Sequence, residues 1–197
     1  MRKFLLVLAI LSVNSSFAQR ADTVAYMGIF MTAQDYAANK LSYAVNCDSS
    51  TGKIKTGCLF SQNHIALVGG GKKVELDRDS VFGYRNCKQK DFRFYKNDDR
   101  EYQILENKSI VIYTADVREN SPSEKTFMLV PAYFFSKTLS SEILPLTGIN
   151  LKRTFPDNHK FHDSIDVEFH NDKDISTYDP LHKMYRVNYL LSQSLSN

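Results

Sequence analysis

The chain of 197 residues has little net charge and, beyond its N-terminus, no long apolar run. Lys and Arg number 25 against 22 Asp and Glu, which gives a formal net charge of +3. Proteins that bind nucleic acid depend mainly on basic side chains that neutralise phosphates, so this near-balance argues against that class. The longest later apolar run is residues 127–135, which contains Pro131 and is too short to span a bilayer.

The sequence also lacks the motifs of the common enzyme classes. It contains no Gly-x-Ser-x-Gly elbow for a nucleophilic serine and no His-Glu-x-x-His zinc motif. Residues 69–73, Gly-Gly-Gly-Lys-Lys, lack the four-residue gap between glycines and the Ser or Thr that a phosphate loop needs. They lead into a β-rich run, so they predict a hairpin turn.

Cysteine is scarce, and its count is odd. Cys47, Cys58 and Cys87 are the three cysteines, and one thiol is left over if two of them pair. Cys47 and Cys58 flank the turn-rich residues 48–52, so we predict a bridge between them, with Cys87 as a buried thiol. Spacing alone does not choose among the three pairs, and Cys58–Cys87 is the main rival.

The N-terminus has the three parts of a secretory signal peptide. Arg2 and Lys3 precede an apolar core over residues 4–13, and Ser16 and Ala18 place small residues before a cut. We predict cleavage after Ala18, so that residues 1–18 are removed and residues 19–197 are exported to the periplasm or beyond the cell. Gln19 stands where a lipoprotein would have a cysteine, so we expect no lipid anchor and no transmembrane segment in the mature chain.

The exported part reads as a single α+β domain that is β-rich over about residues 24–135. Short β-prone runs recur there, with Gly, Asn and Asp turn signals between them, which predicts an antiparallel meander or a partly closed barrel. Thr32 and Asp35 form a weak capping box for a short helix. Residues 110–113, Ile-Val-Ile-Tyr, are apolar on both faces, which predicts a central strand covered on both sides.

The last third, about residues 138–195, is predicted to be helical and to pack on the sheet. Asp179 and Pro180 are typical of a helix start, with Asp as the cap and Pro in the first turn. Residues 163–169 have apolar side chains at both helical and alternating spacing, so a strand remains an alternative there. Unless these helices cover residues 127–135, the exposed face of that strand is an aggregation liability.

Four of the five histidines lie in this last third, among many acidic residues. On a helix, His162, Asp166 and His170 are four residues apart and share one face, a spacing that can hold zinc or another divalent ion. The alternative is a solvated face of acidic and histidine side chains. Because Asp179–Pro180 predicts a new helix before His182, we expect the late histidines not to form one metal centre.

The most distinctive segment interleaves aromatic and basic residues. In strands, Arg93 and Tyr95 share a face, and together with Tyr84 and Arg85 they would form an exposed surface able to stack on a sugar, a peptide or a headgroup. The alternative is an ordinary core face opposite a solvated one.

These residues carry a resemblance. Residues 81–85 (Val-Phe-Gly-Tyr-Arg), 91–95 (Asp-Phe-Arg-Phe-Tyr), 102–105 and 109–113 are similar to a pattern in uncharacterised secreted bacterial proteins, which have a Gly-Tyr-Arg turn, an Arg-Phe-Tyr strand and a hairpin ending in Ile-Tyr. The match covers roughly a sixth of the chain and omits the helical tail. It implies an exported protein and no particular activity.

The sequence therefore favours an exported, non-enzymatic protein of the cell envelope or extracellular space that works by binding or by a structural role. Its partner would be a protein, a glycan or another envelope component, and no cofactor is expected. The alternative is a small envelope hydrolase that uses a divalent metal held by the His and Asp residues of the last third.

Overall fold

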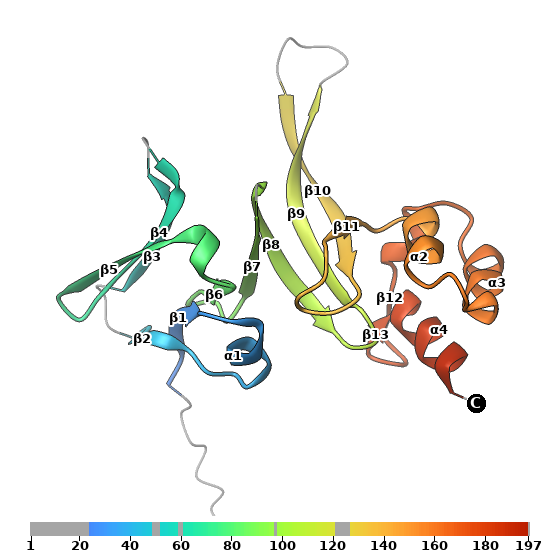
Figure 1. Ribbon diagram of the computed structural model, residues 1–197, viewed down its shortest axis with the longest axis horizontal. Coiled ribbons are helices and arrows are strands. Elements are labelled where there is room, and N and C mark those ends of the chain that lie inside the picture. Colours follow the sequence, from blue (N-terminus) through green and yellow to red (C-terminus); the bar gives the residue numbers. More distant parts are fainter. Residues whose placement is uncertain (1–23, 49–51, 59–60, 97, 121–126, 197) are drawn as a thin grey trace, which may run out of the picture.

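The computed structural model describes residues 24–48, 52–58, 61–96, 98–120 and 127–196. The predicted signal peptide and its cleavage site lie outside these residues. The described chain is an α+β fold in which an eight-stranded antiparallel sheet comes first and most helices come last (Figure 1). This confirms the predicted class and the meander. In the described residues the sheet does not close into a barrel, because β11 and β2 are its two open edges.

The main sheet has the strand order β11-β10-β9-β8-β7-β6-β1-β2, so its middle is a run of sequential antiparallel neighbours. Its strands are β1 (Tyr26–Phe30), β2 (Ser42–Asn46), β6 (Gly83–Arg85), β7 (Asp91–Tyr95), β8 (Asp98–Asn107), β9 (Val111–Asn120), β10 (Phe127–Ser136) and β11 (Leu144–Pro145).

The residues between β2 and β6 in the chain form a second, smaller antiparallel sheet. It consists of β3 (Lys53–Cys58), β4 (Ser61–Gly69) and β5 (Lys72–Asp77), and the 3-10 turn η1 (Arg78–Ser80) follows it. The glycine run forms the two-residue turn of the β4–β5 hairpin, where Gly70 and Gly71 have φ of 58° and 75°. The hairpin prediction is thus confirmed.

The helices are α1 (Ala33–Ala37), α2 (Gly148–Thr154), α3 (His159–Glu168) and α4 (Arg186–Leu195), with a 3-10 turn η2 (Asp174–Ser176) and a two-strand ladder of β12 (Tyr178–Asp179) and β13 (Met184–Tyr185) before α4. The capping box of α1 is present, because the Thr32 side chain accepts from the Asp35 amide and Asp35 accepts from the Thr32 amide. Among the described residues, no helix is long and apolar enough to cross a membrane.

The start of β9 and the residue before it are covered on both sides, as predicted for Ile110–Tyr113. Ile110 and Ile112 pack with Leu151 and Phe161 in a core beneath α2, α3 and α4. Val111 and Tyr113 face the opposite way, in a second core with Tyr102 and Phe134.

The small sheet and the C-terminal helices lie over the same face of the main sheet, at different ends. Phe92, Gln103 and Thr114 are direct cross-strand partners, so they point to one face. At one end of that face Phe92 packs against the core of the small sheet, and at the other end Ile112, two residues from Thr114, packs under the helices. Neither the small sheet nor the helices cover the stretch of the main sheet between them.

Two sequence predictions are corrected here. The first is the helix start at Asp179–Pro180, because helix α4 begins only at Arg186. The Asp179 carboxylate accepts from the amides of Leu181 and His182, so it caps a tight turn between β12 and β13. Residues 163–168 belong to α3, so the strand alternative there is also wrong.

The second correction concerns the disulfide, which joins Cys47 to Cys87 and not to Cys58, with Cα atoms 5.5 Å apart. Strands β2 and β6 both pair antiparallel with β1, so they run in the same direction, and their last residues lie at the same end of β1. Cys47 follows the end of β2 and Cys87 follows β6, which brings them together. The backbone of Cys58 lies at the far end of the β3–β4 hairpin.

Candidate functional site

The predicted surface of Tyr84, Arg85, Arg93 and Tyr95 does not exist as one exposed face. Tyr84 stacks on Phe92 in the core under the small sheet, whereas Arg93 and Tyr95 point to the other face. Tyr84 and Arg93 are also buried, with 6% and 4% of their surfaces exposed. The alternative of a core face opposite a solvated one is therefore right for Tyr84, whereas Arg93 is buried on the face that this alternative leaves to solvent.

Tyr84 and Arg85 have structural partners. The Tyr84 hydroxyl donates to the carboxylate of Glu101, and burial, followed by this interaction, raises the pKa of Tyr84 well above its usual value. Arg85 forms a two-pronged ion pair with Asp91, at 2.6 Å and 2.8 Å, and donates to the Asn39 side chain at 2.7 Å. These contacts tie β6 to its neighbours.

The histidine and acid cluster of the last third is dispersed. The His162 Nε2 atom lies 2.8 Å from the Phe155 carbonyl oxygen, Asp166 pairs with Lys152, and the His170 amide donates to Asp174. Within the part of the chain that the structure describes, no three His, Cys, Asp or Glu side chains gather closely enough to hold a metal ion. His162, Asp166 and His170 are not brought together.

The closest approach to a catalytic pair is at Asp179. Its carboxylate lies 2.7 Å from the His182 Nδ1 atom and accepts from Arg186 at 2.9 Å. The hydrogen bond from His182, followed by those from backbone amides and Arg186, holds the pKa of Asp179 far below its usual value. The His182 ring stacks on Tyr189 at 3.8 Å, so the network orders the start of α4.

Strands β8 and β9 pair along only part of their length and then separate. The two strands pair from Asn107↔Val111 to Gln103↔Thr114, and there the pairing stops. Beyond Thr114, β9 pairs in the described residues with β10 alone, and β8 before Gln103 pairs with β7 alone. The main sheet is therefore split along part of its length.

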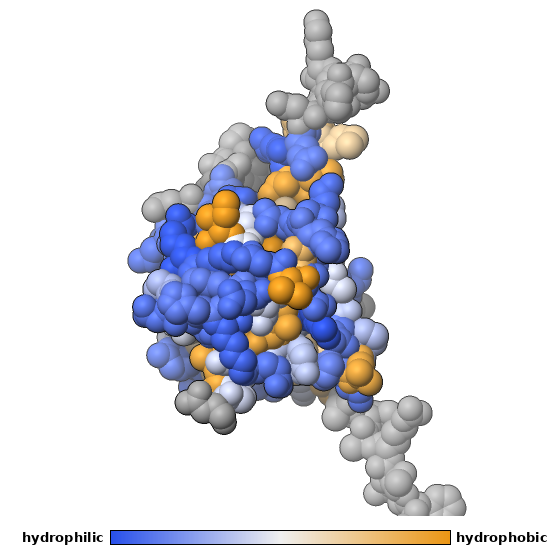
Figure 2. Space-filling model, turned by 90° about the vertical axis from the view of Figure 1, so that its right-hand side faces the viewer, coloured by the Kyte–Doolittle hydropathy of each residue, from blue (hydrophilic) through white to orange (hydrophobic). Residues whose placement is uncertain are grey.

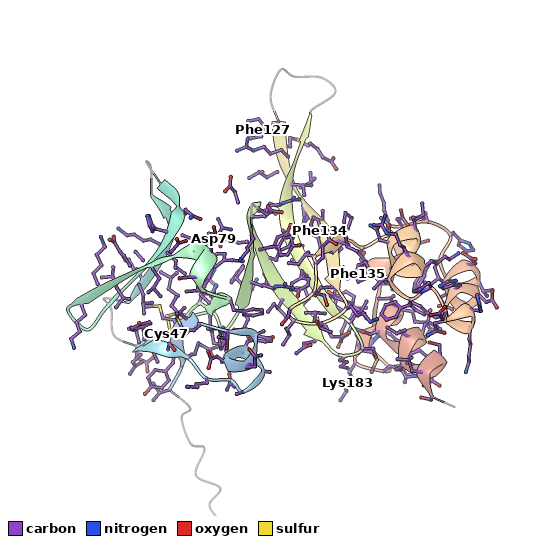
Figure 3. The ribbon with its side chains drawn as sticks, in the orientation of Figure 1. Cys47, Asp79, Phe127, Phe134, Phe135 and Lys183 are labelled. Carbon is purple, nitrogen blue, oxygen red and sulfur yellow. A yellow bond between two sulfur atoms is a disulfide. The ribbon has the colours of Figure 1, made fainter. Side chains whose placement is uncertain are left out.

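The strands beyond this split form an arm, defined as β9 residues 115–120 and β10 residues 127–132. Figure 1 shows it extending past the ends of β7 and β8, and Figure 3 shows Phe127 far along it, with Phe134 and Phe135 at its base. Phe127, Met128 and Leu129 are 57%, 55% and 61% exposed. The helices cover Phe135 but not these residues, so the strand face that the sequence marks as a liability is exposed (Figure 2).

The split contains a cleft of about 730 Å³. Its lining comes from both separated strands and from the neighbouring elements: Phe92, Asp99, Arg100, Glu101, Asp116, Val117, Arg118 and Leu129. By register, Asp116, Arg118 and Leu129 point to the face that also carries Phe92. This is the stretch of sheet that neither the small sheet nor the helices cover.

The cleft has a mixed electrostatic character. Arg100 pairs with Asp98, and the Arg118 guanidinium lies 4.8 Å from the centre of the Phe127 ring. Asp99 and Asp116 take part in none of the ion pairs found among the described residues. The charged lining therefore consists of three carboxylates, those of Asp99, Glu101 and Asp116, and two guanidinium groups, those of Arg100 and Arg118, beside an apolar strip. Comparison with protein-family models, curated proteins and solved structures found no match to this chain.

Proposed function

We propose that this protein is an exported, non-enzymatic binding protein of the cell envelope or extracellular space, which captures an extended segment of a partner polypeptide along the free edge of β9. The observation that carries the proposal is the interruption of β8–β9 pairing at Gln103 and Thr114 beside an open cleft. An unpaired strand edge is a template for an added strand.

The arm supplies the apolar contacts that such a complex needs. A partner strand bound beside β9 would run past Leu129 and Phe92, which line the cleft, and would shield part of the exposed strip at Phe127. Exposed apolar patches of this kind mark interaction sites in many proteins. Main-chain hydrogen bonds would supply affinity, and alternate side chains of the partner would supply specificity.

The charges of the cleft indicate the chemistry of the partner segment. Asp99 and Asp116 would attract Lys or Arg side chains, and the apolar strip would accept Val, Ile or aromatic residues. The preferred segment would therefore alternate basic and apolar residues.

Export is supported by two observations. The apolar leader with its small-residue cleavage pattern is typical of secreted proteins. The Cys47–Cys87 disulfide fits an oxidising compartment, since such bonds are rare in the cytosol. The hydrolase alternative gains no support from the dispersed histidines of the last third.

The experiment places a photo-reactive residue at position 129 and, in a matched control protein, at position 167. Leu129 and Val167 are both exposed aliphatic residues, but Val167 is on α3, away from the cleft. We expect position 129 to cross-link a polypeptide in the native envelope fraction and position 167 not to do so.

Hydrogen exchange with the captured partner then tests the mode of binding. Within residues 115–119, the amides that point away from β10 should gain protection, whereas the amides of residues 73–76 on the edge strand β5 should not. Leu129→Asp should weaken binding by about tenfold, as expected for losing one buried aliphatic side chain, and Val167→Asp should leave it unchanged. Equal cross-linking at both positions, or unchanged protection at residues 115–119, would refute the proposal.

A further inference from the structure

A second cleft, which shares no lining residue with the split, lies where segments distant in the sequence meet. It has a volume of about 350 Å³ and lies between residues 31–34 at the start of α1, the turn η1, the end of β7 and residues 139–140. Its lining includes three cationic side chains, Arg78, Arg93 and Lys96, and one acidic one, Asp79.

Arg93 is buried in this region with only neutral partners. Its guanidinium donates to the Tyr113 hydroxyl at 2.8 Å, to the Ser136 hydroxyl at 3.3 Å and to the Ser141 carbonyl at 2.8 Å. The rings of Phe82, Tyr95 and Tyr113 surround it, with centres 5.6 to 5.7 Å from its central carbon. None of these groups carries a negative charge to offset the buried cation.

Arg78 is in a similar position, and 7% of its surface is exposed. Its Nη2 atom donates to the Arg100 carbonyl at 2.6 Å, and its guanidinium lies 4.4 Å from the centre of the Phe94 ring. Its Nε atom is buried without a hydrogen-bond partner. Most buried polar atoms in proteins are satisfied, so this orphan donor indicates a missing acceptor.

The two buried arginines of the cleft also lack acidic partners. The arginines that form ion pairs among the described residues are Arg85, Arg100 and Arg186, and neither Arg78 nor Arg93 is among them. Arginine does not lose its proton in proteins, so these two buried charges persist at every physiological pH. A buried cation without a counter-charge is costly, and the lining of this cleft contains two of them.

We propose that this cleft binds the anionic group of a small ligand, either a carboxylate or a phosphate, next to Arg78, Arg93 and Lys96. Arginine side chains bind both groups through paired, charge-assisted hydrogen bonds. The volume is at the lower end of the range for small-molecule sites. This binding is independent of the strand-capturing role of β9, and nothing in that role requires it.

The test titrates the mature protein separately with inorganic phosphate and with succinate, at constant ionic strength maintained with sodium chloride. Binding is followed by calorimetry and by the shift in melting temperature. We expect at least one of these anions to bind with one-to-one stoichiometry and to raise the melting temperature above that in chloride alone. The probe that binds more tightly identifies the ligand group as phosphate or carboxylate.

Surface variants locate the site without disturbing the buried arginines. Lys96→Ala should weaken binding by about threefold, and Asp79→Asn should strengthen it by about threefold, as expected for single exposed charges near the anion. Lys88→Ala removes the same charge from the exposed β6–β7 turn, outside the cleft, and should have no effect. If neither anion binds, or if Lys88→Ala has the same effect as Lys96→Ala, the proposal is overturned.

Discussion

The side-chain amide of Asn188 pairs with both backbone groups of Ile110, which is 78 residues away in the chain. Its Oδ1 atom accepts from the Ile110 amide at 2.8 Å, and its Nδ2 atom donates to the Ile110 carbonyl at 3.2 Å. The same Nδ2 atom donates to Glu106 at 2.6 Å. Asn188 is fully buried. Its side chain makes the backbone hydrogen bonds that a neighbouring strand would otherwise make, and it thereby links α4 to the main sheet.

Replacing Asn188 with Ala should therefore destabilise the protein by about 1–3 kcal/mol, because the amide of buried Ile110 loses its partner and its carbonyl keeps only the Lys108 amide. Asn188→Leu should cost a similar amount, since it restores volume but not hydrogen bonds. Urea unfolding would measure both. Gln193→Ala, at an exposed site on the same helix, should change the free energy of unfolding by less than about 0.5 kcal/mol. An Asn188→Leu variant as stable as the wild type would contradict this role.

Gly83 is expected to tolerate no side chain. A Cβ atom at this position would lie 1.9 Å from the Phe92 carbonyl oxygen, which is backbone and cannot rotate away. We expect Gly83→Ala to cost about 3 kcal/mol or more, because β6 would have to move away from β7. Gly148→Ala is the matched control, since its Cβ would meet no atom closer than 3.6 Å. Similar melting temperatures for the two variants would show that β6 and β7 are less closely packed than described.

The disulfide should stabilise the fold mainly by lowering the conformational entropy of the unfolded chain. It closes a loop with a sequence separation of 40, for which the chain-entropy model gives about 4 kcal/mol. Cys87→Ser should lower the free energy of unfolding by about this amount. Non-reducing peptide mapping should recover Cys47 joined to Cys87, both in the wild type and in Cys58→Ser. Recovery of Cys47 joined to Cys58 would restore the pairing predicted from sequence.

Stability should fall at alkaline pH. Burial, followed by the charge of Asp91, raises the pKa of Tyr36 to about 12 from its ordinary value of 10.0. The unfolded chain thus releases this proton at lower pH than the folded one, so the stabilisation is complete below pH 10 and is lost as pH rises to about 12. Melting temperatures of Tyr36→Phe should fall less steeply over that window, whereas Tyr43→Phe, at an exposed ring, should follow the wild type. Identical slopes for Tyr36→Phe and the wild type would count against this assignment.

Local patterns in the sequence predicted much of the fold. The strand at Asp91–Tyr95, the capping box at Thr32 and the turn at Gly70 each depend on neighbouring residues, and each is present. The disulfide depends on strand order instead, because Cys47 and Cys87 meet only when β2 and β6 both flank β1. The start of α4 was misplaced because Asp179 has the composition of a helix cap but uses its carboxylate to close a turn.

The candidate sites are harder to predict from the sequence than the fold is. Arg93 looks like a surface residue in an alternating strand, but in the folded protein it contacts Tyr113 and residues 136–141, which are distant in the sequence. The split between β8 and β9 has no specific local signal, since the mostly charged and polar residues 98–101 and 115–120 that border it are also typical of solvent-exposed strands. The one available hint was the apolar run at residues 127–135, which is longer than the helices can cover.

The Cys47–Cys87 bond also determines what happens if the backbone is cut. The small sheet lies entirely within the loop that this bond closes, and the turn at Gly70 and Gly71 that joins β4 to β5 is exposed. A protease that cleaves there would leave two fragments joined by one covalent link, with β1 and β2 still attached to the rest of the main sheet. In a compartment rich in proteases, such a nicked molecule would keep both of its clefts and would separate into pieces only after reduction.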